Sequence, residues 1–190
     1  MNRERLRVYW AMLGLSAVLG LFIPQLSHAD DIRVLSVGVR GGANGQRVLG
    51  GAEPETFHQY EVVTTVGLPW SWYTEAGWGV STRVMASLGF LTGSGDTALL
   101  TTVVPGIAIG RRDSLLGLDL GLGGSLLSRH EFGRHDFGGP FQVVFTVGLT
   151  IPVYKQFGLG YRLHHISDAG IYSNGLGVDV HMLELTYRFR

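Results

Sequence analysis

Residues 77–90 read GWGVSTRVMASLGF, and their character changes at every step along the chain. Alternate positions carry mostly apolar side chains: Trp78, Val80, Thr82, Val84, Ala86, Leu88 and Phe90. The positions between them are mostly small or polar: Gly77, Gly79, Ser81, Arg83, Met85, Ser87 and Gly89. Because successive side chains of a strand point to opposite faces, this period of two predicts a β-strand with one apolar and one polar face.

Seven other segments of roughly ten residues repeat the alternation: residues 32–40, 57–68, 97–110, 115–126, 141–150, 157–167 and 179–189. Pro105 weakens one of them locally, since proline has no amide hydrogen for the strand ladder. In another, an apolar face is predicted for Leu116, Leu118, Leu120 and Leu122, with Asp119 on the opposite face.

Eight such strands could form a soluble sandwich, but three features favour an outer-membrane barrel. The polar face of the strands combines glycine with scattered charges, which suits the narrow polar interior of an eight-stranded barrel. Aromatic residues gather near segment ends, as in membrane girdles: Tyr60, Trp70, Trp72, Tyr73, Trp78, Phe90, Phe141, Tyr187 and Phe189. Loops and turns also alternate along the chain. The predicted fold is therefore all-β, an eight-stranded antiparallel transmembrane β-barrel.

The predicted connections divide into two sets once the N-terminus is assigned to the periplasm. The outer loops are residues 41–56, 92–96, 128–140 and 168–178. The periplasmic turns are residues 69–76, 111–114 and 151–156.

Residues 1–29 have the features of a secretory signal peptide. A basic start with Arg3, Arg5 and Arg7 precedes an apolar run of 16 residues, 8–23, which is short of the ~20 that a spanning helix needs. Ser27-His28-Ala29 fits a cleavage site. A single barrel domain is predicted for residues 30–190.

Composition excludes several classes of function. Cleavage after Ala29 would leave 12 basic and 14 acidic residues with no basic block, so no nucleic-acid partner is expected. The chain has no cysteine, which excludes a thiolate nucleophile, disulfides and cysteine metal sites.

The end of the segment 157–167 carries the strongest candidate chemistry. Alternation places His165 and Ser167 on the apolar, lipid-facing side, and Asp179 shares this parity at the start of the next strand. Neighbouring antiparallel residues lie about 4.5–5.5 Å apart, so a Ser–His–acid row across two strands is possible. The alternative is that these side chains only decorate the polar rim of the membrane.

The flanking sequence supports the catalytic interpretation. His165-x-Ser167-x-Ala169-Gly170, Gly177-x-Asp179 and the closing Leu185-x-Tyr187-x-Phe189 together resemble the lipid A 3-O-deacylase family (PagL) over about 25 C-terminal residues. In that family a His-x-Ser pair and a carboxylate twelve residues later form a catalytic triad. The resemblance implies an outer-membrane serine esterase that removes the acyl chain at position 3 of lipid A, with His165, Ser167 and Asp179 as the triad.

The chain departs from the family pattern at two positions. Asp179 stands where glutamate is common, and Asp168 stands where asparagine usually follows the serine. A carboxylate at position 168 would oppose the negative charge that develops in an oxyanion hole. The backbone N–H groups near Ala169 and Gly170, or the side chain of Asn174, are the alternative oxyanion candidates.

Other polar residues are assigned simpler roles. His164 is expected inside the barrel near Arg162 and Glu184, and His181 at the rim. His130 and His135 are placed in a mobile outer loop, and without further partners their spacing predicts no metal site. In the same loop Arg129 and Arg134 either contact lipopolysaccharide phosphates or only solvate the loop.

The expected partners are lipid A or lipopolysaccharide as substrate and the surrounding outer-membrane lipids, with no cofactor. The oligomeric state stays open, a homodimer included. Two alternatives remain at this point: a structural or adhesive barrel without activity, and a phospholipase-type esterase that uses the same row.

Overall fold

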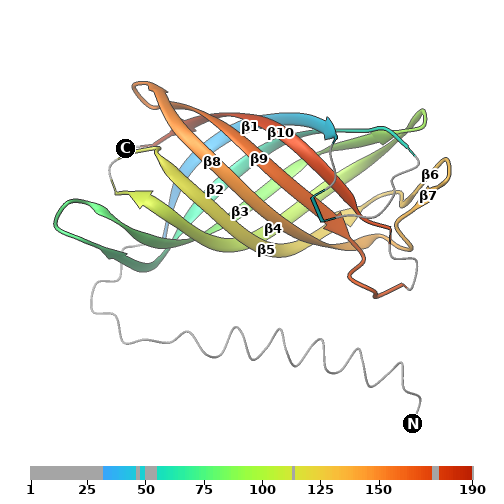
Figure 1. The fold of residues 1–190 in the computed structure, drawn as a ribbon, viewed down its shortest axis with the longest axis horizontal. Coiled ribbons are helices and arrows are strands. Elements are labelled where there is room, and N and C mark those ends of the chain that lie inside the picture. Colours follow the sequence, from blue (N-terminus) through green and yellow to red (C-terminus); the bar gives the residue numbers. More distant parts are fainter. Residues whose placement is uncertain (1–31, 46–47, 50–54, 113, 173–175, 190) are drawn as a thin grey trace, which may run out of the picture.

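Eight long antiparallel strands close into a barrel, which confirms the predicted fold class (Figure 1). The computed structural model describes residues 32–45, 48–49, 55–112, 114–172 and 176–189, so the predicted signal peptide lies outside the described residues. The barrel strands are β1 (Arg33–Asn44), β2 (Phe57–Tyr73), β3 (Trp78–Gly93), β4 (Asp96–Arg111), β5 (Gly117–Leu127), β8 (Phe141–Tyr154), β9 (Phe157–Ser167) and β10 (Val178–Arg188). Closure comes from the pairing of β1 with β10. In the described part of the chain no helix is long and apolar enough to cross a membrane.

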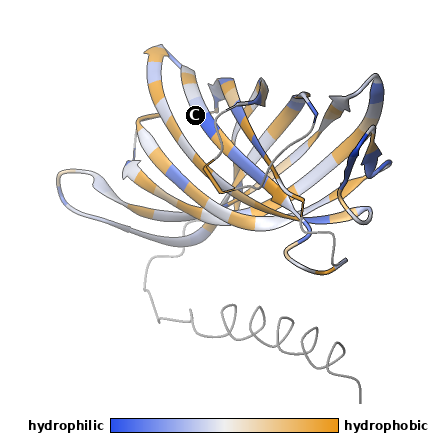
Figure 2. Ribbon diagram, turned by 45° about the vertical axis from the view of Figure 1, so that its right-hand side comes forward, coloured by the Kyte–Doolittle hydropathy of each residue, from blue (hydrophilic) through white to orange (hydrophobic). Residues whose placement is uncertain are grey.

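Hydropathy alternates along the strands (Figure 2), and the exposures show that the apolar face of the strands points outward. The register partners Val62 and Leu88 are 59% and 54% exposed, whereas Glu61, next to Val62 but on the inward face, is 4% exposed. Leu118 and Leu122 are exposed and Asp119 is buried, in agreement with the predicted parity. Leu116, by contrast, precedes β5 and is not part of its outward face. An exposed apolar belt around a closed barrel requires a hydrocarbon surrounding.

Charged pairs fill the barrel interior. Arg40 pairs with Glu61, Arg83 with Asp119 (2.7 Å), and Arg162 with Glu184 (3.0 Å). Arg162 also reaches Asp119 at 3.4 Å, and Arg40 reaches Glu184 at 3.9 Å, so the pairs form one network of three arginines and three carboxylates. Buried charges need such partners because an unpaired one is costly to desolvate.

Several strands are longer than predicted. β2 continues through residues 69–73, which the sequence analysis assigned to a turn, and β8 continues to Tyr154. The register of β2 against β3 shifts between Gly67 and Ser71. This irregularity accommodates Pro69 in the strand, since a bulge leaves a residue without a ladder partner. β1 is also longer than predicted, since it continues to Asn44 inside the predicted outer loop 41–56.

A small hairpin closes one end of the barrel, opposite the end where the C-terminus lies (Figure 1). It consists of β6 (Glu131–Phe132) and β7 (His135–Asp136). Phe132 and Phe137 are fully buried and pack edge-on against Phe57, with ring centroids 5.4 and 5.8 Å away. The prediction of a mobile polar loop is therefore wrong for this part of residues 128–140. The charges of this loop are apparent from the sequence, whereas the burial of its aromatic residues is not.

Candidate functional site

β9 and β10 bring His165 and Asp179 together at the barrel end that carries the hairpin. The two residues are direct partners in the strand register. His165 Nδ1 lies 2.6 Å from Asp179 Oδ1. An ionised carboxylate only accepts hydrogen bonds, so in the neutral ring Nδ1 donates and Nε2 is left as an acceptor. This is the tautomer that a general base for a hydroxyl group needs.

Asp179 is not exposed to lipid, although its parity is outward. Its side chain is fully buried, while that of His165 is 15% exposed. The backbone N–H groups of Val48 and Leu49, in the connection from β1 to β2, donate to Asp179 Oδ2 at 2.6 and 2.7 Å. The expectation of a lipid-facing carboxylate is thus wrong, because a loop far away in sequence covers it. These charge-assisted bonds stabilise the carboxylate and fix its orientation.

Ser167 is the last residue of β9 and lies two positions beyond His165 on the same face. Among the described residues, no hydrogen bond links its hydroxyl to the His165 ring. Gly177 lies over the gap between them, because a Cβ there would be 3.0 Å from His165 Cε1 and 3.0 Å from Ser167 Cβ. The glycine therefore keeps this gap open.

The tight turn after Ser167 carries two of the oxyanion candidates. Ala169 and Gly170 both have left-handed backbone angles, φ 49° and 79°. The Gly170 amide donates to Asp168 Oδ1 at 3.0 Å, so this N–H already has an acceptor. Asp168 is buried on the opposite face from Ser167 and also accepts from the Tyr172 amide, at 3.1 Å. Asn174 lies outside the described residues.

Of the candidate phosphate ligands, Arg129 precedes the β6–β7 hairpin and Arg134 lies in its turn. Arg129 pairs with Asp96 at 2.5 Å. Arg134 has an 81% exposed side chain whose Nε is 3.6 Å from Glu55. Both arginines thus have acidic neighbours, and Arg134 remains accessible to a ligand.

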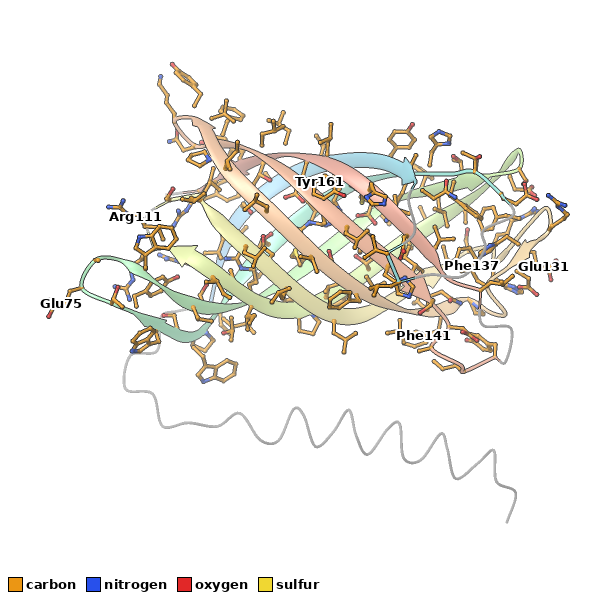
Figure 3. The ribbon with its side chains drawn as sticks, viewed as in Figure 1. Glu75, Arg111, Glu131, Phe137, Phe141 and Tyr161 are labelled. Atoms are coloured by element: carbon orange, nitrogen blue, oxygen red, sulfur yellow. The ribbon has the colours of Figure 1, made fainter. Side chains whose placement is uncertain are left out.

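The remaining histidines separate into different environments. His164 is buried inside the barrel with Nδ1 3.0 Å from Gln59 Nε2, whereas the expected partners Arg162 and Glu184 bond to each other. His181 lies on the outward face, where its Nδ1 is 2.5 Å from the Tyr161 hydroxyl. Figure 3 shows Tyr161 on the outside of the barrel, away from Phe137 and Glu131 at the hairpin end.

Two parts of the site were missed by sequence reasoning. The amides of Val48 and Leu49 carry no signal, because any residue except proline supplies a backbone N–H. Gly177 was noticed only as part of a motif. Its position two residues before the acid could have indicated a close approach to the His-x-Ser pair.

Comparison with known proteins identifies the family. The model of the family "Lipid A 3-O-deacylase (PagL)" matches residues 58–188. The chain belongs to this family. The matched range includes His165, Ser167 and Asp179, and membership confirms the resemblance inferred from the C-terminal motifs.

One solved structure supports the architecture. The crystal structure of the outer membrane enzyme PagL is similar with a TM-score of 0.66 and 16% identity, and the match covers 81% of this chain and 99% of that one. At this identity the likeness concerns the fold alone. The outer membrane protein Ail of Yersinia pestis matches with a TM-score of 0.42 and 14% identity, over 82% of this chain and 99% of that one. No curated protein matches the sequence. Family and fold together make this protein an outer-membrane β-barrel.

Proposed function

We propose that this protein is a serine esterase that hydrolyses the ester-linked acyl chain at position 3 of lipid A. The observation that carries the proposal is the hydrogen-bonded pair of His165 and Asp179, beside Ser167 on the outward face. In a chain of the lipid A 3-O-deacylase family, this arrangement supports the Ser–His–acid interpretation over rim decoration. The reaction needs no cofactor.

In the proposed first step, Ser167 attacks the ester carbonyl. Rotation of its side chain toward His165 Nε2 would let the ring take the hydroxyl proton as Oγ bonds to the carbonyl carbon. Asp179 then stabilises the imidazolium, as the acid of such a triad does. The protonated His165 gives its proton to the departing sugar oxygen, which leaves an acyl-serine.

In the second step, His165 activates a water molecule that hydrolyses the acyl-serine. Both steps develop negative charge on the carbonyl oxygen, which requires a nearby donor. Because Gly170 N–H donates to Asp168, the Ala169 amide is the better oxyanion candidate among the described residues. Asp168 opposes this charge less than the sequence indicates, since its carboxylate is buried on the other face and accepts two amides.

The substrate would approach sideways from the outer leaflet. Outer-membrane barrels keep both termini in the periplasm, and here the ends of β1 and β10 that carry the termini pair through Ser36 and Arg188, away from His165. The site would therefore face the outer leaflet, where lipid A is found and where water is available from the surface. Arg134, with its exposed side chain, is positioned to contact a phosphate of the headgroup.

Mass spectrometry of lipid A tests the proposal. Cells producing the wild-type protein should contain lipid A that lacks one acyl chain at position 3. Ser167→Ala should restore the full mass, whereas the matched control Ser128→Ala at the same barrel end should not. A loss of phospholipid acyl chains with intact lipid A would favour the phospholipase alternative. Unchanged lipids with a folded wild-type barrel would favour the structural alternative.

A further inference from the structure

The outer hairpin gathers three metal-ligating side chains that the candidate active site does not use. His130, Glu131 and Asp136 each offer one ligand atom, and these atoms all lie within 4.8 Å of one another. Sequence spacing drew attention to His130 and His135 instead. The structure separates those two, because the His135 ring is buried between Phe57 and Phe137, at centroid distances of 5.0 and 4.4 Å.

The backbone of the hairpin holds this cluster in place. Glu131 and Asp136 are direct partners across β6 and β7. The Phe137 amide donates to the His130 carbonyl at 2.9 Å, which brings His130 beside Asp136. Asp136 Oδ1 accepts from the Gly138 amide at 2.7 Å and lies 3.0 Å from His130 Nδ1. The three ligands therefore sit on a base that the buried aromatic residues anchor, so little ordering is needed to bring them together.

We propose that His130, Glu131 and Asp136 form a binding site for one divalent transition-metal ion, with Zn²⁺ the best match. One imidazole with two carboxylates suits zinc-like ions better than Mg²⁺ or Ca²⁺, which prefer oxygen ligands alone. Zinc binds these groups at about 2.0–2.2 Å, so its ligand atoms lie about 3–3.5 Å apart. Small side-chain rotations close the present spacing, and water would complete the coordination.

The surroundings allow both access and charge balance. The side chains of His130 and Asp136 are 34% and 41% exposed, and Glu131 lies at the tip of the structure (Figure 3). The hydrogen bond from the Gly138 amide is the main reason that the pKa of Asp136 is lowered, with His130 contributing as well. Arg129 and Arg134, which are close to the cluster in sequence, pair with Asp96 and Glu55.

Isothermal titration calorimetry on the untagged, folded barrel in detergent tests the site, because a histidine tag would bind the same ions. Zn²⁺ should bind with a stoichiometry of one, and Mg²⁺ and Ca²⁺ should not compete at equal concentration. His130→Ala, Glu131→Gln and Asp136→Asn should each raise the Kd by at least about tenfold. The exposed His58 of β2 provides the matched control, since His58→Ala should leave the Kd unchanged.

The two isosteric variants keep the test decisive if one protein fails to fold. Asn at position 136 can still accept from Gly138, and Glu131 is exposed, so the barrel should form in both cases. Absence of Zn²⁺ binding to the wild-type barrel would overturn the proposal, and so would binding that survives both isosteric substitutions. The readout is independent of deacylation, so its result does not depend on the proposed enzymatic function.

Discussion

His164 and His165 are neighbours on β9 that face opposite sides of the barrel. His164 is buried in the interior, where Gln59 contacts its Nδ1. His165 faces outward, where Asp179 accepts from Nδ1 and the other ring nitrogen is directed away from the pair. In both histidines Nδ1 has a polar partner. Only His165, however, faces the side of the barrel from which a lipid can approach.

The interior and the outward site differ in how their polar groups are compensated. Inside, arginines and carboxylates neutralise one another within the wall of the barrel, as Arg162 does with Glu184 and Asp119. Outside, the imidazole of His165 lies beside Ser167 on the outward face, while its partner Asp179 is buried beneath the amides of Val48 and Leu49. Polar groups on the lipid face are costly, so the outward His165 and Ser167 support the proposed chemistry, whereas the interior network contributes to stability.

Replacement of each histidine by alanine should produce the largest difference in deacylation activity between two variants. His165→Ala should lower deacylation by about 10⁴-fold or more, because Ser167 loses its base. His164→Ala should retain activity within about tenfold and cost about 1–3 kcal/mol of stability, since the buried Gln59 Nε2 loses one of its two partners and keeps only Glu61. Deacylation of detergent-solubilised lipid A and heat-induced unfolding measure the two effects. Comparable losses of activity in both variants would show that the two faces do not divide the roles in this way.

Substitution of the acid should have the next largest effect. Asp179→Asn should lower turnover by about 10³-fold or more, because the amide cannot stabilise the imidazolium. Asp179→Glu should stay active, since it restores the common residue of the family. Asp168→Asn should be mild, because an amide oxygen can still accept from Gly170. An active Asp179→Asn together with an inactive Asp168→Asn would transfer the role to Asp168.

Crowding of the gap between His165 and Ser167 should reduce activity moderately. In Gly177→Ala the new methyl group would meet both side chains at 3.0 Å. A displacement of this kind should lower kcat by about 10- to 100-fold with little change in KM. Gly160→Ala is a matched control, since its Cβ would meet Leu149 O and Thr150 Oγ1 at 3.3 Å, with neither His165 nor Ser167 among its nearest atoms. Equal kinetics in the two variants would remove Gly177 from the site.

The smallest effect concerns the hairpin and leaves the chemistry unchanged. Burial lowers the pKa of His135 from 6.5, although Asp136 and Glu55 oppose the shift. The unfolded hairpin then binds a proton more readily, so its packing is most stable above pH 6.5 and weakens as the pH falls. The loss is at most about 1.4 kcal/mol per pH unit.

Amide hydrogen exchange of residues 128–140 measures this effect. At each pH the exchange rate of the wild-type hairpin is divided by that of His135→Leu. This ratio should be larger at pH 5 than at pH 7.5. A ratio that does not change with pH would show that the His135 proton is not linked to hairpin packing.

The barrel was predictable because alternate residues of each strand face the lipid or the barrel interior, so that apolar and polar side chains alternate in the sequence. The parity of Leu118, Asp119 and Leu122 followed from alternation alone. The burial of Asp179 did not, because it depends on backbone amides 130 and 131 residues away in sequence. The fold of the β6–β7 hairpin was missed for a similar reason: Phe132 and Phe137 are buried by a long-range contact with Phe57. Local patterns thus predict faces and pairs of strands, whereas loops that return to the site need long-range information.

Labelling with a lipophilic fluorophosphonate, followed by peptide mass spectrometry, tests the central claim most directly. Such a reagent phosphonylates a serine only where a base activates it. The account predicts modification of Ser167 in the wild-type barrel, loss of deacylation in proportion to labelling, and no modification in His165→Ala. Inactivation of the enzyme with the label on another residue, or undiminished labelling in His165→Ala, would contradict it.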